Sequence, residues 1–170
     1  MAVISLPVRS RAPRSVARFA LAILPLSVAL SSVSFAQTAD EVAKAKDEIW
    51  AKEKAIYAQR QTGGDYYFNN SAQGYLAWVY GAPKPFRREN LRPKGPPRAV
   101  PTKEAIANEF SDFSLQGDTA IIYYVNHRTM LADGTPVDQL FDNIHVWVRE
   151  GGDWKVIASM SRLREPAKAK

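Results

Sequence analysis

The stretch that decides the fold is FDNIHVWVREGGDWKVI, residues 141–157. β-Branched and aromatic residues alternate with polar ones along 141–149, as they do in a strand with one buried face. A second run rich in such residues, 154–157, follows the Glu-Gly-Gly-Asp segment at 150–153. Two runs of this kind across a short glycine-containing loop predict a β-hairpin.

The same kind of pattern continues upstream. A Gly-Asp turn at 117–118 follows Leu115-Gln116 and is itself followed by AIIYYV, residues 120–125, which is rich in β-branched and aromatic side chains. We therefore expect residues 113–162 to form three strands joined by two turns.

The part of the chain before these strands favours helices. Residues 40–60 predict an α-helix that Asp40 caps, because apolar side chains recur there at helical spacing. The expected buried stripe consists of Val42, Ala45, Ile49, Trp50, Ile56 and Tyr57. The aromatic segment 65–81 predicts a short helix followed by a strand at 75–80, and Thr102 suits the cap of a short helix at 103–110. Helices followed by a run of strands indicate the α+β class.

The segment 82–101 differs in kind from its neighbours. It holds six prolines and six basic residues against one acid, Glu89. Proline disfavours helix interiors and central strands, so we expect an extended surface loop. Such a loop could bind an anionic partner or simply be solvated. Residues 166–170 form a basic tail that we expect to be disordered.

The first 36 residues predict a signal peptide. Four arginines and no acid occur in 1–18, an apolar run follows at 19–30, and Ser34 and Ala36 place small residues before a cut at Gln37. The run is short for a membrane span, so we expect cleavage, no stable membrane anchor afterwards, and a periplasmic or secreted product. A retained anchor and an organelle transit peptide are the alternatives.

The remaining segment, 37–165, has the size of one domain. The net charge of residues 37–170 is only about +2 (23 − 4 basic against 17 acidic residues), which argues against a nucleic-acid partner. The chain has no cysteine, which excludes disulfides and a cysteine nucleophile. Two histidines at unrelated spacing make no metal site, and no phosphate-binding or dinucleotide motif predicts a cofactor.

Several weak motifs in a fixed order resemble one known group of proteins. Gly-Asp-Thr-Ala at 117–120, Val-Trp-Val-Arg at 146–149 and Gly-Gly-x-Trp-Lys-Val at 151–156 are similar to the C-terminal sheet of the nuclear-transport-factor-2-like (NTF2-like) superfamily, and most of all to its SnoaL-like and ketosteroid-isomerase-like bacterial members. The resemblance covers about 40–162. It implies a curved antiparallel sheet wrapped on N-terminal helices, a cone whose mouth holds a small, mostly apolar molecule, and in some members proton transfer.

One departure from the resembled pattern bears on chemistry. Many such proteins carry a histidine shortly before a serine at the end of the last strand, whereas Met160 precedes Ser161 here. The resemblance therefore does not imply chemistry that depends on that histidine.

Strand periodicity selects the candidate acid–base residues. Asp142 shares a strand face with Ile144, Val146 and Val148, and this more apolar face is expected to meet the helices. Asp142 would then stand at the cavity rim as an acid or base, or else pair with an arginine in solvent. His145 on the opposite face is a second candidate, or a residue of a dimer interface, and His127 is a third, or an exposed residue near a turn.

Three aromatic residues complete the predicted site. Tyr57, Trp78 and Tyr123 are candidate ligand-binding residues that could equally be plain core. Two functions therefore stay open: an exported small-molecule-binding domain, with or without isomerase- or cyclase-like proton transfer, and a non-catalytic interaction module. In both we expect a homodimer, and in the second it forms through the sheet face that carries His145 and Trp147.

Overall fold

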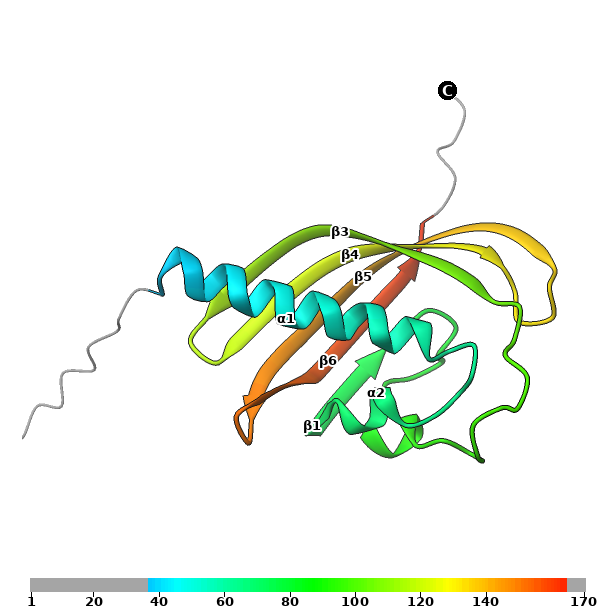
Figure 1. Ribbon diagram of the computed structural model, residues 1–170, viewed down its shortest axis with the longest axis horizontal. Helices are drawn as coiled ribbons and strands as arrows, with labels where there is room; N and C mark the ends of the chain where they lie inside the picture. The colour runs from blue at the N-terminus through cyan, green and yellow to red at the C-terminus, as the bar shows by residue number, and fades with distance from the viewer. Residues whose placement is uncertain (1–36, 165–170) are drawn as a thin grey trace, which may run out of the picture. The chain divides into compact units, whose positions relative to one another are not determined.

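The last third of the chain forms strands as predicted, but they are longer than the sequence pattern indicated, and parts of four strands rather than three lie in 113–162 (Figure 1). The computed structural model describes residues 37–164. Its elements, in chain order, are α1 Ala39–Ala58, α2 Tyr66–Asn69, β1 Ser71–Trp78, β2 Phe86–Arg87, the 3-10 helix η1 Arg88–Leu91, β3 Ala105–Gln116, β4 Thr119–Met130, β5 Pro136–Glu150 and β6 Asp153–Leu163.

All six strands belong to one open, curved sheet, in the order β2-β1-β6-β5-β4-β3 (Figure 1). The strands β3 to β6 form an antiparallel meander. The predicted α+β class is confirmed, but the sheet is mixed rather than antiparallel throughout, because β1 pairs with β6 in parallel. A parallel pair needs a long connection, and here the whole segment between β1 and β6 supplies it.

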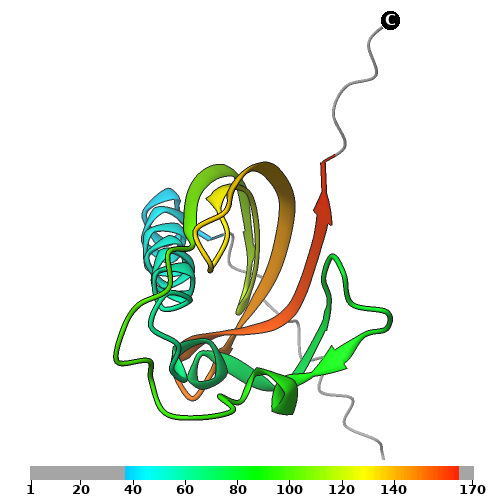
Figure 2. The same cartoon turned by 90° about the vertical axis from the view of Figure 1, so that its right-hand side faces the viewer.

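The helix α1 lies against one face of this sheet, as the edge-on view shows (Figure 2). Thr38, not Asp40, caps it: the Thr38 hydroxyl accepts from the Glu41 amide, and the Glu41 carboxylate accepts from the Thr38 amide. This reciprocal pair satisfies two backbone donors at the helix start. The stripe buried against the sheet consists of Ala45, Ile49, Glu53 and Ile56.

Two predictions about local structure need correction. Residues 103–110 do not form a helix; from Ala105 onward they belong to β3, which pairs with β4 from Ala105 to Gln116. Partners on a neighbouring strand outweigh a weak local preference for helix. The strand predicted at 75–80 is β1, which begins and ends earlier.

The basic, proline-rich segment 82–101 is a surface loop for most of its length, and it also contains β2 and η1. Two of its arginines hold it to the domain. Arg88 donates to the carbonyls of Ser71 and Phe68, and both Arg88 and Arg92 stack on the Phe68 ring. The predicted leader, 1–36, and the predicted tail, 166–170, lie outside the described residues.

The sheet face that meets α1 is the opposite of the one predicted. His145 and Trp147 on β5 and Tyr124 on β4 are buried beneath the helix, and Trp147 is fully inaccessible. The face of Asp142 and Ile144 points away from α1; we call these two faces the inner and the outer face. The prediction failed because it ranked the faces by polarity, whereas the polar groups of the inner face find partners there.

Candidate functional site

A cavity of about 480 Å³ lies between the helices and the inner face of the sheet. α1 contributes Tyr57, α2 contributes Tyr67, and the sheet contributes Tyr75 and His145. Aromatic rings with one polar tip each give the cavity a largely apolar wall with a few hydrogen-bonding groups, which is the usual composition of a small-molecule site. The volume is within the range of such sites.

Beneath this wall, one buried carboxylate holds two ring nitrogens. Glu53 is fully buried, and its Oε1 accepts from Nε1 of Trp147 at 2.8 Å and lies 2.7 Å from Nδ1 of His145. An indole N–H can only donate, so Oε1 is an acceptor. An Nδ1–H of His145 satisfies the same oxygen. Glu53 therefore fixes the ring orientation and leaves Nε2 of His145 as its free nitrogen.

Tyrosine hydroxyls surround this histidine. Nε2 of His145 lies 3.3 Å from the hydroxyl of Tyr124 and 3.4 Å from that of Tyr67. The Tyr124 hydroxyl also contacts the Tyr57 hydroxyl at 3.1 Å, so a chain of polar groups runs from the histidine to the cavity wall. Burial raises the pKa of Tyr57, Tyr67 and Tyr124, and the hydroxyls stay protonated near neutral pH.

A second hydroxyl cluster lies on the other side of Tyr67. Its hydroxyl lies 2.8 Å from that of Tyr75 and 2.7 Å from Oγ of Ser159, and Tyr75 donates to the same Oγ at 3.0 Å. Burial also raises the pKa of Tyr75. Three neutral hydroxyls in contact can exchange donor and acceptor roles by rotation, so the cluster can adapt to a ligand carbonyl or hydroxyl.

An amide chain crosses the sheet beside the cavity. Asn143 donates to Oδ1 of Asn126 at 2.8 Å, and Asn126 donates to Oδ1 of Asn108 at 2.6 Å. The chain joins β5, β4 and β3 on the inner face. Asn126 and Asn143 also line the cavity, so polar groups reach its wall from the sheet as well as from the helices.

Two arginines stand where the cavity is more accessible. Arg60 follows α1, Arg128 is on β4, and both bind the Glu104 carboxylate, at 2.9 Å and 3.1 Å respectively. Burial raises the pKa of Glu104, but the hydrogen bond from Arg60 and the charges of Arg60 and Arg128 outweigh it, so the pKa is lowered and the carboxylate is ionised near neutral pH.

The structure separates the residues predicted from sequence. Tyr57 and His145 line the cavity as predicted for a site. Trp78 and Tyr123 do not; they are exposed on the outer face, 53% and 44% accessible. His145 is not on an outer face, and a dimer through His145 and Trp147 is excluded because α1 covers both side chains.

The two other acid–base candidates also lie away from this cavity. Asp142 is on the outer face, where the hydrogen bond from Arg164 and that from Arg162 lower its pKa against the opposing effect of burial. Of the two roles that the sequence left open for Asp142, the structure therefore has the pairing with arginine. His127 lies 2.7 Å from the exposed carboxylate of Asp138, on the outer face as well. The roles proposed for these residues stay predictions, but neither one can reach a ligand in the inner cavity.

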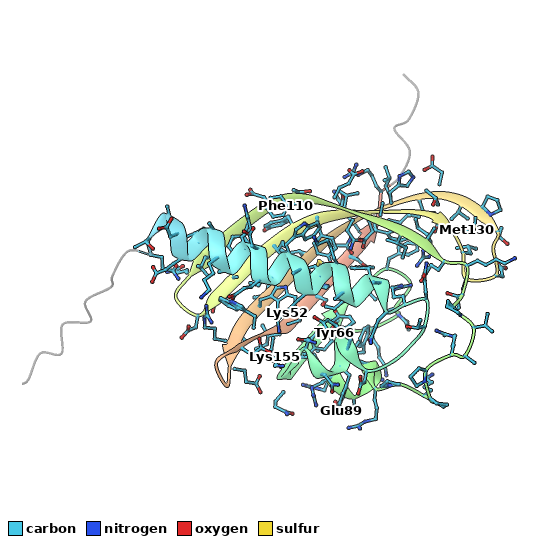
Figure 3. All side chains as sticks on the ribbon, viewed as in Figure 1. Lys52, Tyr66, Glu89, Phe110, Met130 and Lys155 are labelled. Atoms are coloured by element: carbon cyan, nitrogen blue, oxygen red, sulfur yellow. The ribbon has the colours of Figure 1, made fainter. Side chains whose placement is uncertain are left out.

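Sequence reasoning missed Glu53. It lies four residues after Ile49 and three before Ile56, so helical spacing placed it on the buried stripe, and a buried acid calls for a partner. Lys52 of α1, labelled in Figure 3, donates to Asp153 and Asn70, which ties α1 to the start of β6.

Over residues 37–164, no group of three or more acids and histidines could hold a metal ion. In the same part of the chain, no helix is long and apolar enough to cross a membrane.

No family model and no curated protein matches the sequence. Several solved structures do match, at low identity. A candidate ketosteroid isomerase from Parabacteroides distasonis has a TM-score of 0.53 and 14% identity over 69% of this chain and 86% of its own. An NTF2-like protein of unknown function from Pseudomonas putida has a TM-score of 0.53 and 13% identity over 78% and 93%. The association domain of a C. elegans CaMKII has a TM-score of 0.51 and 12% identity over 73% and 98%.

Proposed function

We propose that this chain, which has the NTF2-like fold, is a small-molecule-binding domain whose ligand occupies the cavity between α1, α2 and the inner face of the sheet. One observation carries the proposal: a cavity of about 480 Å³ whose wall combines tyrosine rings with a histidine that a buried carboxylate orients. A cavity that was only an imperfection of the core would not gather so many hydrogen-bonding groups.

The ligand that fits is a small, mostly apolar molecule with at least one carbonyl or hydroxyl. Its ring or chain would lie against the tyrosines, and its oxygen would meet Nε2 of His145 or the hydroxyls of Tyr67 and Tyr75. A ligand that binds only the folded state raises the melting temperature. We therefore expect a thermal-shift screen of apolar metabolites to find compounds that stabilise the protein.

A bulky substitution tests whether the cavity is the ligand-binding site. Ser159→Phe would intrude on the hydroxyl cluster, so it should abolish the shift, whereas Val100→Phe, in an exposed loop, should keep it. If no compound in a broad library stabilises the wild type, or if Ser159→Phe keeps a native fold by circular dichroism and an undiminished shift, the cavity is not a ligand site.

The same geometry can support proton transfer. Nε2 of His145 is an acceptor when Nδ1 donates to Glu53, so it could take a proton from a carbon or hydroxyl of the ligand, and the nearby tyrosine hydroxyls could stabilise a developing oxyanion. Asp142, the acid–base group first expected from sequence, faces the other side of the sheet.

Turnover of a bound compound would test this step. His145→Gln should reduce the rate by roughly 10²–10⁴-fold, the usual contribution of a positioned base, with little change in ligand affinity. Asp142→Asn is the matched control and should turn over normally. Equal rates for wild type and His145→Gln would show that His145 is not the base.

A second function, self-association, is favoured by the outer face. Trp78, Tyr123 and Met160 are 53%, 44% and 57% exposed there and line one open hollow. Large apolar side chains gathered on one face usually mark an interface. One similar structure is an association domain, and the homodimer is therefore proposed through this face instead of the inner one.

Export remains part of the proposal. Its support is the order of arginines, apolar run and small residues in 1–36. Intact mass of the protein recovered from its own cells should correspond to a chain that begins at Gln37. A recovered chain that still begins at Met1 would contradict cleavage.

A further inference from the structure

The charges on the cavity wall have one sign. Among the described residues that line the cavity, Arg60 and Arg128 carry formal charge and none is an aspartate or glutamate. The two side chains are 45% and 22% exposed, in contrast to 6% for that of His145, so the charge is concentrated toward the accessible end. A purely apolar ligand would offer no group of opposite charge to Arg60 and Arg128 at this end of the cavity.

Both arginines bind the same acid, Glu104, which is not among the residues that line the cavity. Glu104 accepts from Nε and Nη2 of Arg60 at 2.9 Å and 3.0 Å, and its Oε1 lies 3.1 Å from Nη2 of Arg128. One carboxylate between two guanidinium groups leaves a net charge of +1. Each guanidinium has five N–H donors, so Glu104 leaves further donors free.

Two buried polar atoms without a partner belong to neighbouring residues here. Nε of Arg128 is buried without an acceptor in the described part of the chain, and Oε1 of Gln139 is buried without a donor. The two residues are direct partners across β4 and β5, and both line the cavity. Buried polar groups in native proteins are normally paired, so a neighbouring unpaired donor and acceptor point to a missing group.

We infer that the natural ligand is an organic anion: an apolar, ring-containing body in the tyrosine-lined part of the cavity, and a carboxylate held by Arg128 and Arg60. This inference rests on the cavity being a ligand site, as proposed above. A carboxylate accepts two parallel hydrogen bonds from one guanidinium and cancels the surplus charge. A hydroxyl or N–H next to the ligand's carboxylate would donate to Oε1 of Gln139. Nε of Arg128 and Oε1 of Gln139 would then both have a hydrogen-bond partner.

A matched pair of probes separates charge from shape. The acid 1-naphthaleneacetate and its neutral amide, 1-naphthaleneacetamide, share one bicyclic body. Isothermal titration calorimetry of the purified protein at pH 7 and low salt should show that the acid binds at least tenfold more tightly than the amide. A surplus of one positive charge at a partly buried position accounts for a preference of this size.

Substitutions assign the preference to the arginines. Arg128→Gln should bring the acid and the amide to within about threefold of each other and leave the amide affinity nearly unchanged, while Arg128→Lys, which keeps the charge but loses the bidentate geometry, should retain only part of the preference. Arg60→Gln is a second variant, and each leaves one arginine on Glu104. Arg162→Gln removes an arginine of the outer face and should have no effect.

The outcomes separate two questions: whether the ligand is an anion, and whether the cavity binds a small molecule at all. Equal binding of acid and amide to the wild type, or a preference that survives in both Arg128→Gln and Arg60→Gln, overturns the assignment of an anionic ligand and leaves the cavity as a site for neutral molecules. If neither probe nor any compound of the screen binds, the small-molecule proposal fails together with this inference.

Discussion

Removal of the Glu53 side-chain oxygens is expected to destabilise the fold strongly, even though it deletes a polar group from the interior. In Glu53→Ala, Nε1 of Trp147 and Nδ1 of His145 both lose their acceptor, at about 1–3 kcal/mol for each buried group left unpaired. His145 can reduce its share by moving its proton to Nε2. The lost side-chain volume adds to the destabilisation.

An opposing contribution limits the total. Oε2 of Glu53 is itself buried without a partner in the described part of the chain, and its removal ends that cost, again about 1–3 kcal/mol. We therefore expect Glu53→Ala to lower the free energy of unfolding by about 2–4 kcal/mol, a large share of the 5–15 kcal/mol that is typical. Glu53→Gln keeps one acceptor oxygen and should cost less.

Urea denaturation followed by circular dichroism measures the difference. With a slope of about 2 kcal/mol per molar, the middle of the usual range, the midpoint of Glu53→Ala should fall by roughly 1–2 M. Glu48→Ala is the matched control: this partly exposed residue of α1 forms an ion pair with Lys44, and its loss should cost about 0.5 kcal/mol or less. If Glu53→Ala lies within 1 kcal/mol of Glu48→Ala, the carboxylate does not organise the inner face as argued.

Three further outcomes are expected. Trp78→Glu should convert a dimer to a monomer in sedimentation velocity, and Val100→Glu should not; a wild type that is monomeric at high concentration contradicts the outer-face interface. Asp142→Asn should flatten the acid limb of the stability–pH curve: the lowered pKa of Asp142 stabilises the fold above the ordinary value of 3.8, and this stabilisation disappears as pH falls through the native pKa. Asn126→Ala should cost about 1–3 kcal/mol in urea denaturation, because it breaks both links of the amide chain; a cost below 0.5 kcal/mol would show that the chain contributes little.

The strands of the last third could be predicted because their signals are local. A two-residue period and glycines with φ of +64° and +83° at 151–152 specify the β5–β6 hairpin without reference to the remaining chain. The predicted helix at 40–60 is confirmed for the same reason: its apolar spacing is visible within the segment itself.

The orientation of β5 could not be predicted from the strand alone. Its outer face is the more apolar of the two, but the choice depends on Glu53, which is 92 residues away from His145 in the chain. A histidine and an indole nitrogen are unfavourable in a core until an acid from another element meets them. Polarity within the strand therefore favoured the wrong face, and with it Asp142 in place of His145.

The same limit explains β3. Thr102 and Glu104 gave residues 103–110 the pattern of a capped helix start, but the Glu104 carboxylate is held by Arg60 and Arg128 instead, and the segment after it pairs with β4. Contacts between distant elements decided the outcome, and no local signal in this segment indicated them.

The parallel pairing of β1 with β6 has a consequence for how the protein forms in time. Residues 71–78 leave the ribosome early, but they pair with 156–160, almost the last part of the domain to be made. The inner face likewise needs α1 and β5 together before Glu53 meets His145. Contacts so distant in sequence slow folding and keep it from finishing before β6 has been made. A nascent chain of this topology is expected to stay open until then, and an open chain is the state that the proposed export would require.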